Sequence, residues 1–105
     1  MAAYTPNTHG PQAGTSSFAD LIASDVTNQH IIRTISIANT GASTRTAYVS
    51  IGAGSAATEI IETSIPAHST LVFNGWWDVP TSTAVQVKQD TGTDVTFTAS
   101  GYHYA

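Results

Sequence analysis

Apolar and polar residues alternate in short stretches along this sequence, and these stretches recur about every ten residues. In residues 29–39, for example, a period of two places Ile31, Ile35 and Ile37 on one face, together with Arg33. Successive side chains of a strand point to opposite faces of a sheet, so this period is typical of strands that bury one face. Residues that favour turns separate the stretches. The pattern therefore predicts about seven or eight antiparallel strands.

The composition also favours strands over helices. Ile, Val and Thr account for 33 of the 105 residues, whereas Leu occurs only twice. Side chains branched at Cβ are stiff, which suits a pleated sheet and disfavours a helix. Residues 18–22 also fit a helical spacing, through Phe18, Leu21 and Ile22, but we favour a strand there. We predict an all-β fold, an antiparallel β-sandwich of the Ig-like or jelly-roll-like kind.

The first fifteen residues differ from the rest of the chain. They contain Pro6, Gly10 and Pro11 and show no period. This predicts an extended N-terminal arm over residues 1–15, followed by a β-sandwich domain over residues 16–105. Because chain termini fray unless something holds them, we expect a partner to order the arm. The N-terminus lacks the basic and apolar regions of a secretion signal, and no apolar run reaches about 18 residues, so we expect no membrane span.

Charged residues are sparse in this chain. Three basic residues stand against seven acidic ones, and charged residues make up 10% of the sequence. Binding to a phosphate backbone depends on Lys and Arg, so we do not expect nucleic acid as a partner. The 28 Ser and Thr residues must supply much of the surface instead. Such a surface repels neighbouring copies weakly, which suits assembly into an oligomer. No cysteine is present, so packing rather than disulfides must hold the fold.

Two motifs resemble functional sequences but have simpler interpretations. Asp90-Thr91-Gly92 matches the tripeptide of aspartic proteases, but only 15 residues follow Asp90, so we interpret it as a hairpin turn. Residues 52–57 fit the loose dinucleotide fingerprint Gly-x-Gly-x-x-Ala, but no long helix can follow, so we interpret them as a loop. We therefore predict no enzymatic activity and no cofactor.

The histidines do not form a metal-binding motif in the sequence. They lie far apart, without the short spacing that brings two imidazoles to one metal ion, so we interpret them as single surface or turn residues and predict no metal site. The four are His9, His30, His68 and His103.

Aromatic residues supply the candidate interface. Trp76 and Trp77 are adjacent, and adjacent residues of a strand point to opposite faces, so one indole should enter the core and the other should face outward. The outward indole would contact another subunit or stack on a sugar; alternatively, the arm or the following turn covers both. Tyr102 and Tyr104 alternate in the same way, and such residues are common at contact surfaces. The predicted interface residues are Tyr4, Pro6, Pro11, Trp76, Trp77, Tyr102 and Tyr104.

Three segments carry a family resemblance. They are the turn Asn39-Thr40-Gly41, the segment Ile-Pro-Ala-His-Ser-Thr-Leu at residues 65–71, and a final strand of the form Val-Thr-x-x-x-Ser-Gly at residues 95–101. Over residues 16–102 the chain thereby resembles the small β-sandwich virion proteins of tailed bacteriophages. The resemblance implies a capsid decoration or cement protein that binds the major capsid protein and copies of itself, in a virion assembled in the cytoplasm of the bacterial host. The resemblance implies no active-site residue in this sequence.

Two other roles stay open at this point. The same surface chemistry would suit an accessory subunit of the tail, neck or baseplate. A carbohydrate-binding adhesin module would instead use Trp76 or Trp77 as a stacking platform, with Asp78 or Asn74 as a hydrogen-bonding partner.

Overall fold

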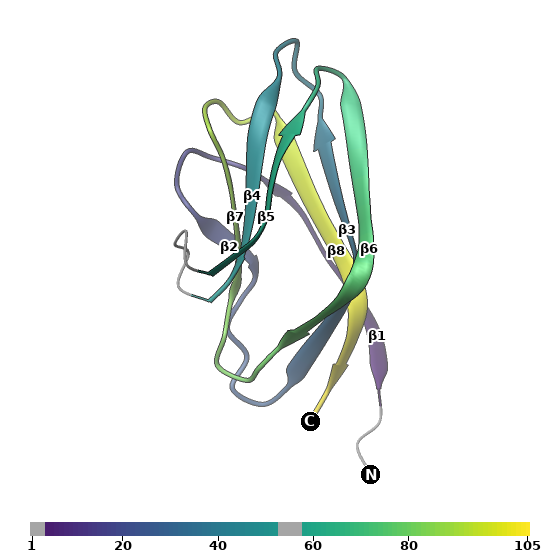
Figure 1. The fold of residues 1–105 in the computed structure, drawn as a ribbon. Helices are drawn as coiled ribbons and strands as arrows, with labels where there is room; N and C mark the ends of the chain where they lie inside the picture. Colours follow the sequence, from purple (N-terminus) through teal and green to yellow (C-terminus); the bar gives the residue numbers. More distant parts are fainter. Residues whose placement is uncertain (1–3, 53–57) are drawn as a thin grey trace.

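The computed structural model describes residues 4–52 and 58–105, which form eight strands in two antiparallel sheets packed face to face (Figure 1). The predicted all-β antiparallel sandwich is confirmed. No helix long and apolar enough to span a membrane occurs in these residues. Of the predicted loop at residues 52–57, residues 53–57 lie outside the described part. The strands are β1 (Thr5–Ala13), β2 (Ala19–Ile22), β3 (Gln29–Asn39), β4 (Arg45–Ile51), β5 (Glu59–Ile65), β6 (Ser69–Val79), β7 (Val85–Gln89) and β8 (Val95–Tyr104).

The strand order identifies the kind of sandwich. One sheet has the order β1-β8-β3-β6 and the other has the order β2-β7-β4-β5. The pairs β1/β8, β2/β7, β3/β6 and β4/β5 are all antiparallel neighbours, and successive pairs fall in opposite sheets. This is a long antiparallel ribbon wound into two layers, which is the arrangement of a jelly roll. Of the two predicted kinds of sandwich, the structure therefore has the jelly-roll topology.

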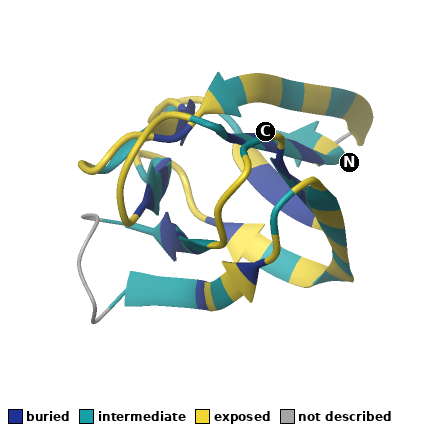
Figure 2. Ribbon diagram, turned by 90° about the horizontal axis from the view of Figure 1, so that it is seen from above, coloured by how far each residue is buried: buried dark blue, intermediate teal, exposed yellow. Residues whose placement is uncertain are grey.

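The core fills the space between the two sheets. Figure 2 shows bands of different burial alternating along the strands, as the period of two predicts. Phe97 is the largest fully buried side chain. Burying a Val, Ile or Phe side chain contributes about 1.5–3 kcal/mol relative to exposure, so this interior is the main source of stability. The largest fully buried aliphatic side chains are Ile32, Ile35, Ile37, Val49, Ile65, Val79, Val85, Val87 and Val95.

Within residues 18–22, Ala19–Ile22 form the strand β2, as we favoured, and not a helix. β2 pairs with β7, with Ala19 opposite Val87 and Ile22 opposite Val85. The register shifts between Asp20 and Ile22, which lets both Leu21 and Ile22 be buried. The irregularity explains why the segment also matched a helical spacing.

The N-terminal arm differs from the prediction. Residues Thr5–Ala13 form β1, an edge strand paired with β8 from Thr5 opposite His103 to Ala13 opposite Thr96. The arm is therefore extended, but its own chain orders it and no partner is needed. The sequence hides this strand because its register shifts between His9 and Gln12, around Gly10 with its positive φ of 96°.

The alternation along β3 changes at a bulge. The register shifts directly after Ile32 in both pairings of β3, and Arg33 is the extra residue relative to β8. Ile32 and Ile35 consequently face the core, whereas Ile31 lies outside the core cluster, on the outer face. The prediction that Ile31 and Arg33 share a face with Ile35 is therefore wrong. Side chains of a strand alternate between the two faces of the sheet. One inserted residue therefore moves every preceding side chain of that strand to the opposite face.

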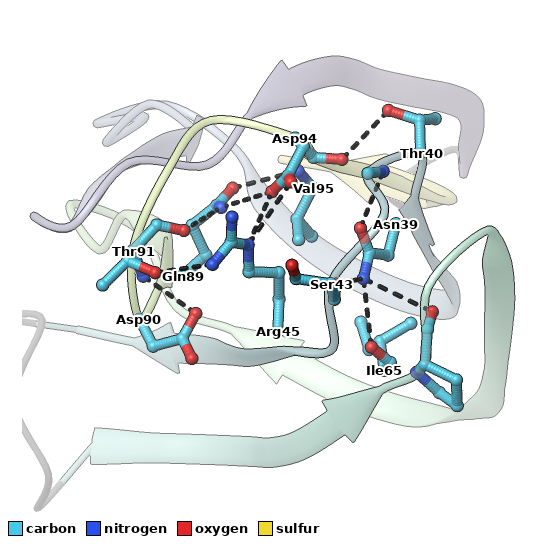
Figure 3. Close-up of polar contacts among 12 residues, drawn as sticks. Asn39, Thr40, Ser43, Arg45, Ile65, Gln89, Asp90, Thr91, Asp94 and Val95 are labelled. Carbon is cyan, nitrogen blue, oxygen red and sulfur yellow. Dashed lines mark hydrogen bonds and ion pairs between the residues drawn. The ribbon is translucent and has the colours of Figure 1, made fainter.

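Polar side chains hold the turn between β7 and β8. The Asp94 carboxylate accepts hydrogen bonds from Arg45 Nε at 3.1 Å and from Gln89 Nε2 at 2.9 Å (Figure 3). The Arg45 guanidinium, followed by the Gln89 amide, lowers the pKa of Asp94. Gln89 is fully buried, and its Oε1 accepts a hydrogen bond from Val95 N at 3.0 Å. This pairing fixes where β8 begins.

The Asp90-Thr91-Gly92 motif lies in this turn. The turn crosses from β7 in one sheet to β8 in the other, so it is not the hairpin turn we predicted. Asp90 is exposed, and its Oδ1 accepts a hydrogen bond from Thr91 N at 2.8 Å. The carboxylate thus shapes the turn, and Gly92 supplies the positive φ of 78° that the turn requires.

Substitution of Gln89 tests this turn. Gln89→Leu should lower the free energy of unfolding by about 1–3 kcal/mol, because it leaves the buried N–H of Val95 without an acceptor. Gln86→Leu is the control on the same strand. The Gln86 side chain donates a hydrogen bond to the exposed Asp20, so the loss of this side chain should change stability by less than about 0.5 kcal/mol. Urea unfolding followed by circular dichroism measures both, and equal losses would contradict the assigned role of Gln89.

Candidate interaction surface

One end of the β1-β8-β3-β6 sheet carries an aromatic surface on its outer face. Cross-strand partners share a face of a sheet, and the register places Pro6, Tyr102, Ile31 and Asp78 in one row across the four strands. This is the end at which β1 begins and β8 ends (Figure 1). The bulge in β3 is what brings Ile31 into the row.

Two adjoining hollows shape this surface. The first has a volume of about 320 Å³ and is lined by Tyr4, Ile31, Trp76 and Tyr102, which we call the aromatic patch. The second has a volume of about 540 Å³, and we call it the polar groove. Tyr102 lines both hollows, so they form one continuous surface. The polar groove is lined by Pro6, Asn7, Thr8, Arg33, Ser100, Gly101 and Tyr102.

Trp76 is exposed yet held on two sides. Its side chain is 58% exposed. The Arg33 guanidinium lies 5.0 Å from the centre of the indole, and Arg33 Nε donates a hydrogen bond to Gly75 O at 2.8 Å. The indole Nε1 donates a hydrogen bond to Asp78 Oδ1 at 3.1 Å. A cation over the ring and a bonded N–H together fix the orientation of the indole. Trp76 therefore presents a preorganised apolar surface to the solvent.

The two tryptophans lie on opposite faces of the sheet, as the sequence predicts. Trp76 faces outward, whereas Trp77 is half-buried and packs against the core. Among residues 4–52 and 58–105, neither the described part of the arm nor the following turn covers Trp76. Because Trp77 packs inward, it is not placed to serve as an exposed stacking platform.

The structure brings together most of the predicted interface residues. Tyr4, Trp76 and Tyr102 line the aromatic patch, and Pro6 lies beside it in the polar groove. The Tyr104 ring lies 5.0 Å from that of Tyr4, and Tyr104 Oη donates a hydrogen bond to Gln29 Oε1 at 2.9 Å. Two predicted residues lie elsewhere. Pro11 lies farther along β1, at the register shift, and Trp77 faces the core.

Two members of this surface are not predicted by the sequence. The period of two places both Ile31 and Arg33 on the face of Ile35 and Ile37. Alternation alone cannot locate a bulge. Gly101 is the signal that was available, because the backbone of Ile31 approaches it so closely that a Cβ at position 101 would collide with the Ile31 carbonyl. A glycine within a strand often marks such a close approach.

Three of the four histidines gather on the inner face at the same end. The ring centroids of His9 and His30 lie 5.3 Å apart, and those of His30 and His103 lie 5.9 Å apart. The interpretation of these three as separate surface or turn residues is therefore wrong, because β1, β3 and β8 are neighbours in the sheet. Only His68 lies in a turn, with a positive φ of 54°.

Polar neighbours form hydrogen bonds with some of the ring nitrogens in this histidine cluster, which comprises His9, His30 and His103. His30 Nε2 lies 3.2 Å from Asp25 Oδ2, and His103 Nδ1 lies 3.0 Å from Asn7 Nδ2. Hydrogen bonds from the backbone N–H groups of Asn28 and Thr27 strongly lower the pKa of Asp25. Burial, followed by the positive charges of His30 and His103 when protonated, lowers the pKa of His9. Within the described residues, no three or more His, Asp or Glu side chains are placed to hold a metal ion.

The two tryptophans should differ in their effect on stability. Trp77→Ala should lower the free energy of unfolding by about 3 kcal/mol, because it opens a cavity beside the core. Trp76→Ala should lower it by less than about 1 kcal/mol, because the indole contacts mainly solvent, Arg33 and Asp78. Urea unfolding measured by circular dichroism gives both values. A larger loss for Trp76→Ala would mean that its indole supports the fold.

The histidine cluster predicts a dependence of stability on pH. A lowered pKa in the folded state means that the unfolded chain binds the proton more readily, so stability should fall as the pH drops below about 6.5. His9→Asn should reduce this loss between about pH 7 and pH 5. His68→Asn is the matched control, since Asn tolerates the same positive φ. Thermal unfolding across this range provides the measurement, and identical pH profiles for the two variants would contradict the role of His9.

The comparisons with known proteins bear on the fold. No protein-family model matches the sequence, and no curated protein matches it significantly. Among solved structures, the chain is similar to a chain of the T13 particle of infectious bursal disease virus, with a TM-score of 0.51 and 7% identity, over 98% of this chain and 30% of that one.

Two further similarities are to structures of the same virus. They are the Gx strain, with a TM-score of 0.39 and 11% identity over 99% of this chain and 31% of that one, and the VP2 subviral particle, with a TM-score of 0.30 and 10% identity over 98% and 32%. This chain thus spans about a third of the length of the viral chains. At 7% identity, the similarity to the T13 particle shows a shared fold.

Proposed function

We propose that this protein is a non-enzymatic structural component of a virion, a decoration or cement protein that binds and stabilises neighbouring major capsid subunits. The aromatic patch carries the proposal. Aromatic residues and Arg are enriched at the centres of protein interfaces, where a few of them dominate the binding energy. Trp76 with Arg33 over its ring, beside Ile31 and Tyr102, has that composition.

The rest of the outer face suits broad contact with a partner. Beyond the patch, the rows of this sheet carry short hydroxyl side chains, which lose little rotamer entropy when they are covered. With few charges nearby, little electrostatic desolvation opposes the contact. The outward-facing hydroxyl residues of β3 and β8 are Thr34, Ser36, Thr96, Thr98 and Ser100.

The fold supports a role in a viral particle. Jelly rolls occur in viral capsid and lectin domains, among others, so the fold alone does not select a function. The similarity to a chain of the infectious bursal disease virus particle agrees with the virion role. The more specific assignment, to the head of a tailed bacteriophage assembled in the bacterial cytoplasm, rests on the sequence resemblance. An accessory subunit of the tail, neck or baseplate would use the same surface.

The number of copies per particle tests the proposal. Quantitative mass spectrometry of purified virions should give a ratio to the major capsid protein near one, or a simple fraction of one, because decoration follows the symmetry of the shell. A handful of copies per virion would move the protein to the tail or neck. Its absence from the particle would overturn the virion role.

The aromatic patch should account for binding to the particle. Trp76→Ala should weaken binding of the purified protein to undecorated capsids by about 30-fold or more, as loss of an interface hot spot does. Val26→Ala is the control, because Val26 is an exposed apolar residue, 79% accessible, in the connection between β2 and β3. Co-sedimentation at several protein concentrations measures the affinity. Equal affinities for the two variants would contradict the role of the patch.

Carbohydrate binding is the second candidate, and the polar groove favours it. The groove offers Thr8 and Ser100 as hydrogen-bonding groups directly beside the aromatic patch, a combination that sugars require. Trp76 would be the platform, with Asp78 already bonded to its indole. Calorimetric titration with host polysaccharides distinguishes the two functions. A binding heat that the natural protein gives and Trp76→Ala does not give would support the sugar site. The absence of a binding heat with every polysaccharide tested would contradict carbohydrate binding.

A further inference from the structure

The four edge strands of the sandwich are not equally protected against pairing. Proteins blunt exposed sheet edges with prolines, bulges, charges or short strands. β1 carries two prolines and a register shift, β2 has only four residues, and β5 carries Glu59 and Glu62. β6 has eleven residues, contains no Pro, Lys or Arg, and carries a single charge at Asp78. β6 is therefore the edge with the least protection.

The first half of β6 is also the most regular. From Ser69 opposite Asn39 to Asn74 opposite Thr34, its register with β3 runs without a shift. The irregularity begins after Asn74, where Arg33 reaches Gly75 O. All residues from 69 to 74 are uncharged. Val72 in their middle is 56% exposed, an apolar side chain in the centre of a free edge.

This segment is complementary to itself. If two copies pair antiparallel about a two-fold axis at Val72, each Val72 faces the other copy's Val72. Thr70 then lies opposite Asn74 of the second copy, and Leu71 lies opposite Phe73. Residues 70, 72 and 74 share the outer face of β6, and 71 and 73 share the inner face, so each pair matches in facing and in polarity. Asp78 would lie opposite Pro66, beyond the strand, so no like charges meet.

We propose that residues 69–74 of β6 are an interface between two copies of this chain, which join their β1-β8-β3-β6 sheets into one sheet across a two-fold axis. A second copy is the occupant that fits, because an isologous contact requires a surface that is complementary to itself. The backbone groups along the edge supply the hydrogen bonds, as in other additions of a strand to a sheet edge. The inference goes beyond the proposed function, since the pairing belongs to the isolated protein and needs no capsid.

A single introduced cysteine tests the two-fold axis. The natural chain has no cysteine, so Val72→Cys gives a protein with one thiol. Directly opposed residues of antiparallel strands have Cα atoms about 4.5–5.5 Å apart, within the range that a disulfide spans. Mild oxidation should cross-link Val72→Cys into dimers at least about tenfold faster than Val26→Cys, whose exposed thiol lies far from β6 in the sequence. Equal rates would overturn the proposal.

The association of the natural chain provides the second measurement. Analytical ultracentrifugation should show the unmodified protein as a concentration-dependent dimer, and Val72→Arg should shift it to the monomer. Thermal unfolding of Val72→Arg, compared at a concentration at which both proteins are monomeric, verifies that the exposed substitution leaves the fold intact. A monomeric natural chain at hundreds of micromolar, or a dimer that Val72→Arg does not weaken, would contradict the proposed interface.

Discussion

The pairing of β3 with β8 is the interaction on which the rest of the structure depends. β8 connects β1 to the sheet and β3 connects β6, so one ladder joins two otherwise separate ribbons. Its partners, from Gln29 opposite Tyr104 to Asn39 opposite Val95, lie more than fifty residues apart in the sequence. Such contacts close long loops before they gain any stability, which makes folding of this kind slow. The buried Asn39 and Gln89 side chains fix the end of this ladder through bonds to the connecting turns, at Gly41, Ser43 and Thr91.

The same ladder contains the irregularity that shapes the aromatic patch and the polar groove. Arg33 is an extra residue, and it changes which isoleucines face inward. Ile32 fills the core, while Ile31 joins Tyr102 and Trp76 on the outer face. The inserted residue itself supplies the guanidinium that holds the exposed indole. One departure from regular pairing thus supplies one member of the aromatic patch, Ile31, and the cation that holds another member, Trp76.

How much the sequence reveals depends on the regularity of each element. The strands with unbroken alternation, such as β7 and the first half of β8, could be predicted because inward Val and Phe alternate with polar residues. β1 could not, because it turns polar residues such as Asn7 and His9 inward and carries a bulge. The histidine cluster could not be predicted either, because neighbours in a jelly roll come from distant parts of the chain. Tyr102 and Tyr104 could be named because aromatic residues that alternate in a terminal strand are common at contact surfaces, and Trp76 because one of two adjacent tryptophans in a strand must face outward.

The opposite facing of the two neighbouring tryptophans has an optical consequence. Trp76 is open to the solvent and Trp77 packs against the core, so the two tryptophan fluorophores lie in contrasting environments. A soluble quencher such as iodide reaches the first more readily than the second, which separates their emission without any label. Quenching of the accessible component reports events at the surface, while a red shift of the protected component reports loss of the core. Docking and unfolding can therefore be followed separately, in one sample, by the intrinsic tryptophan fluorescence of the protein.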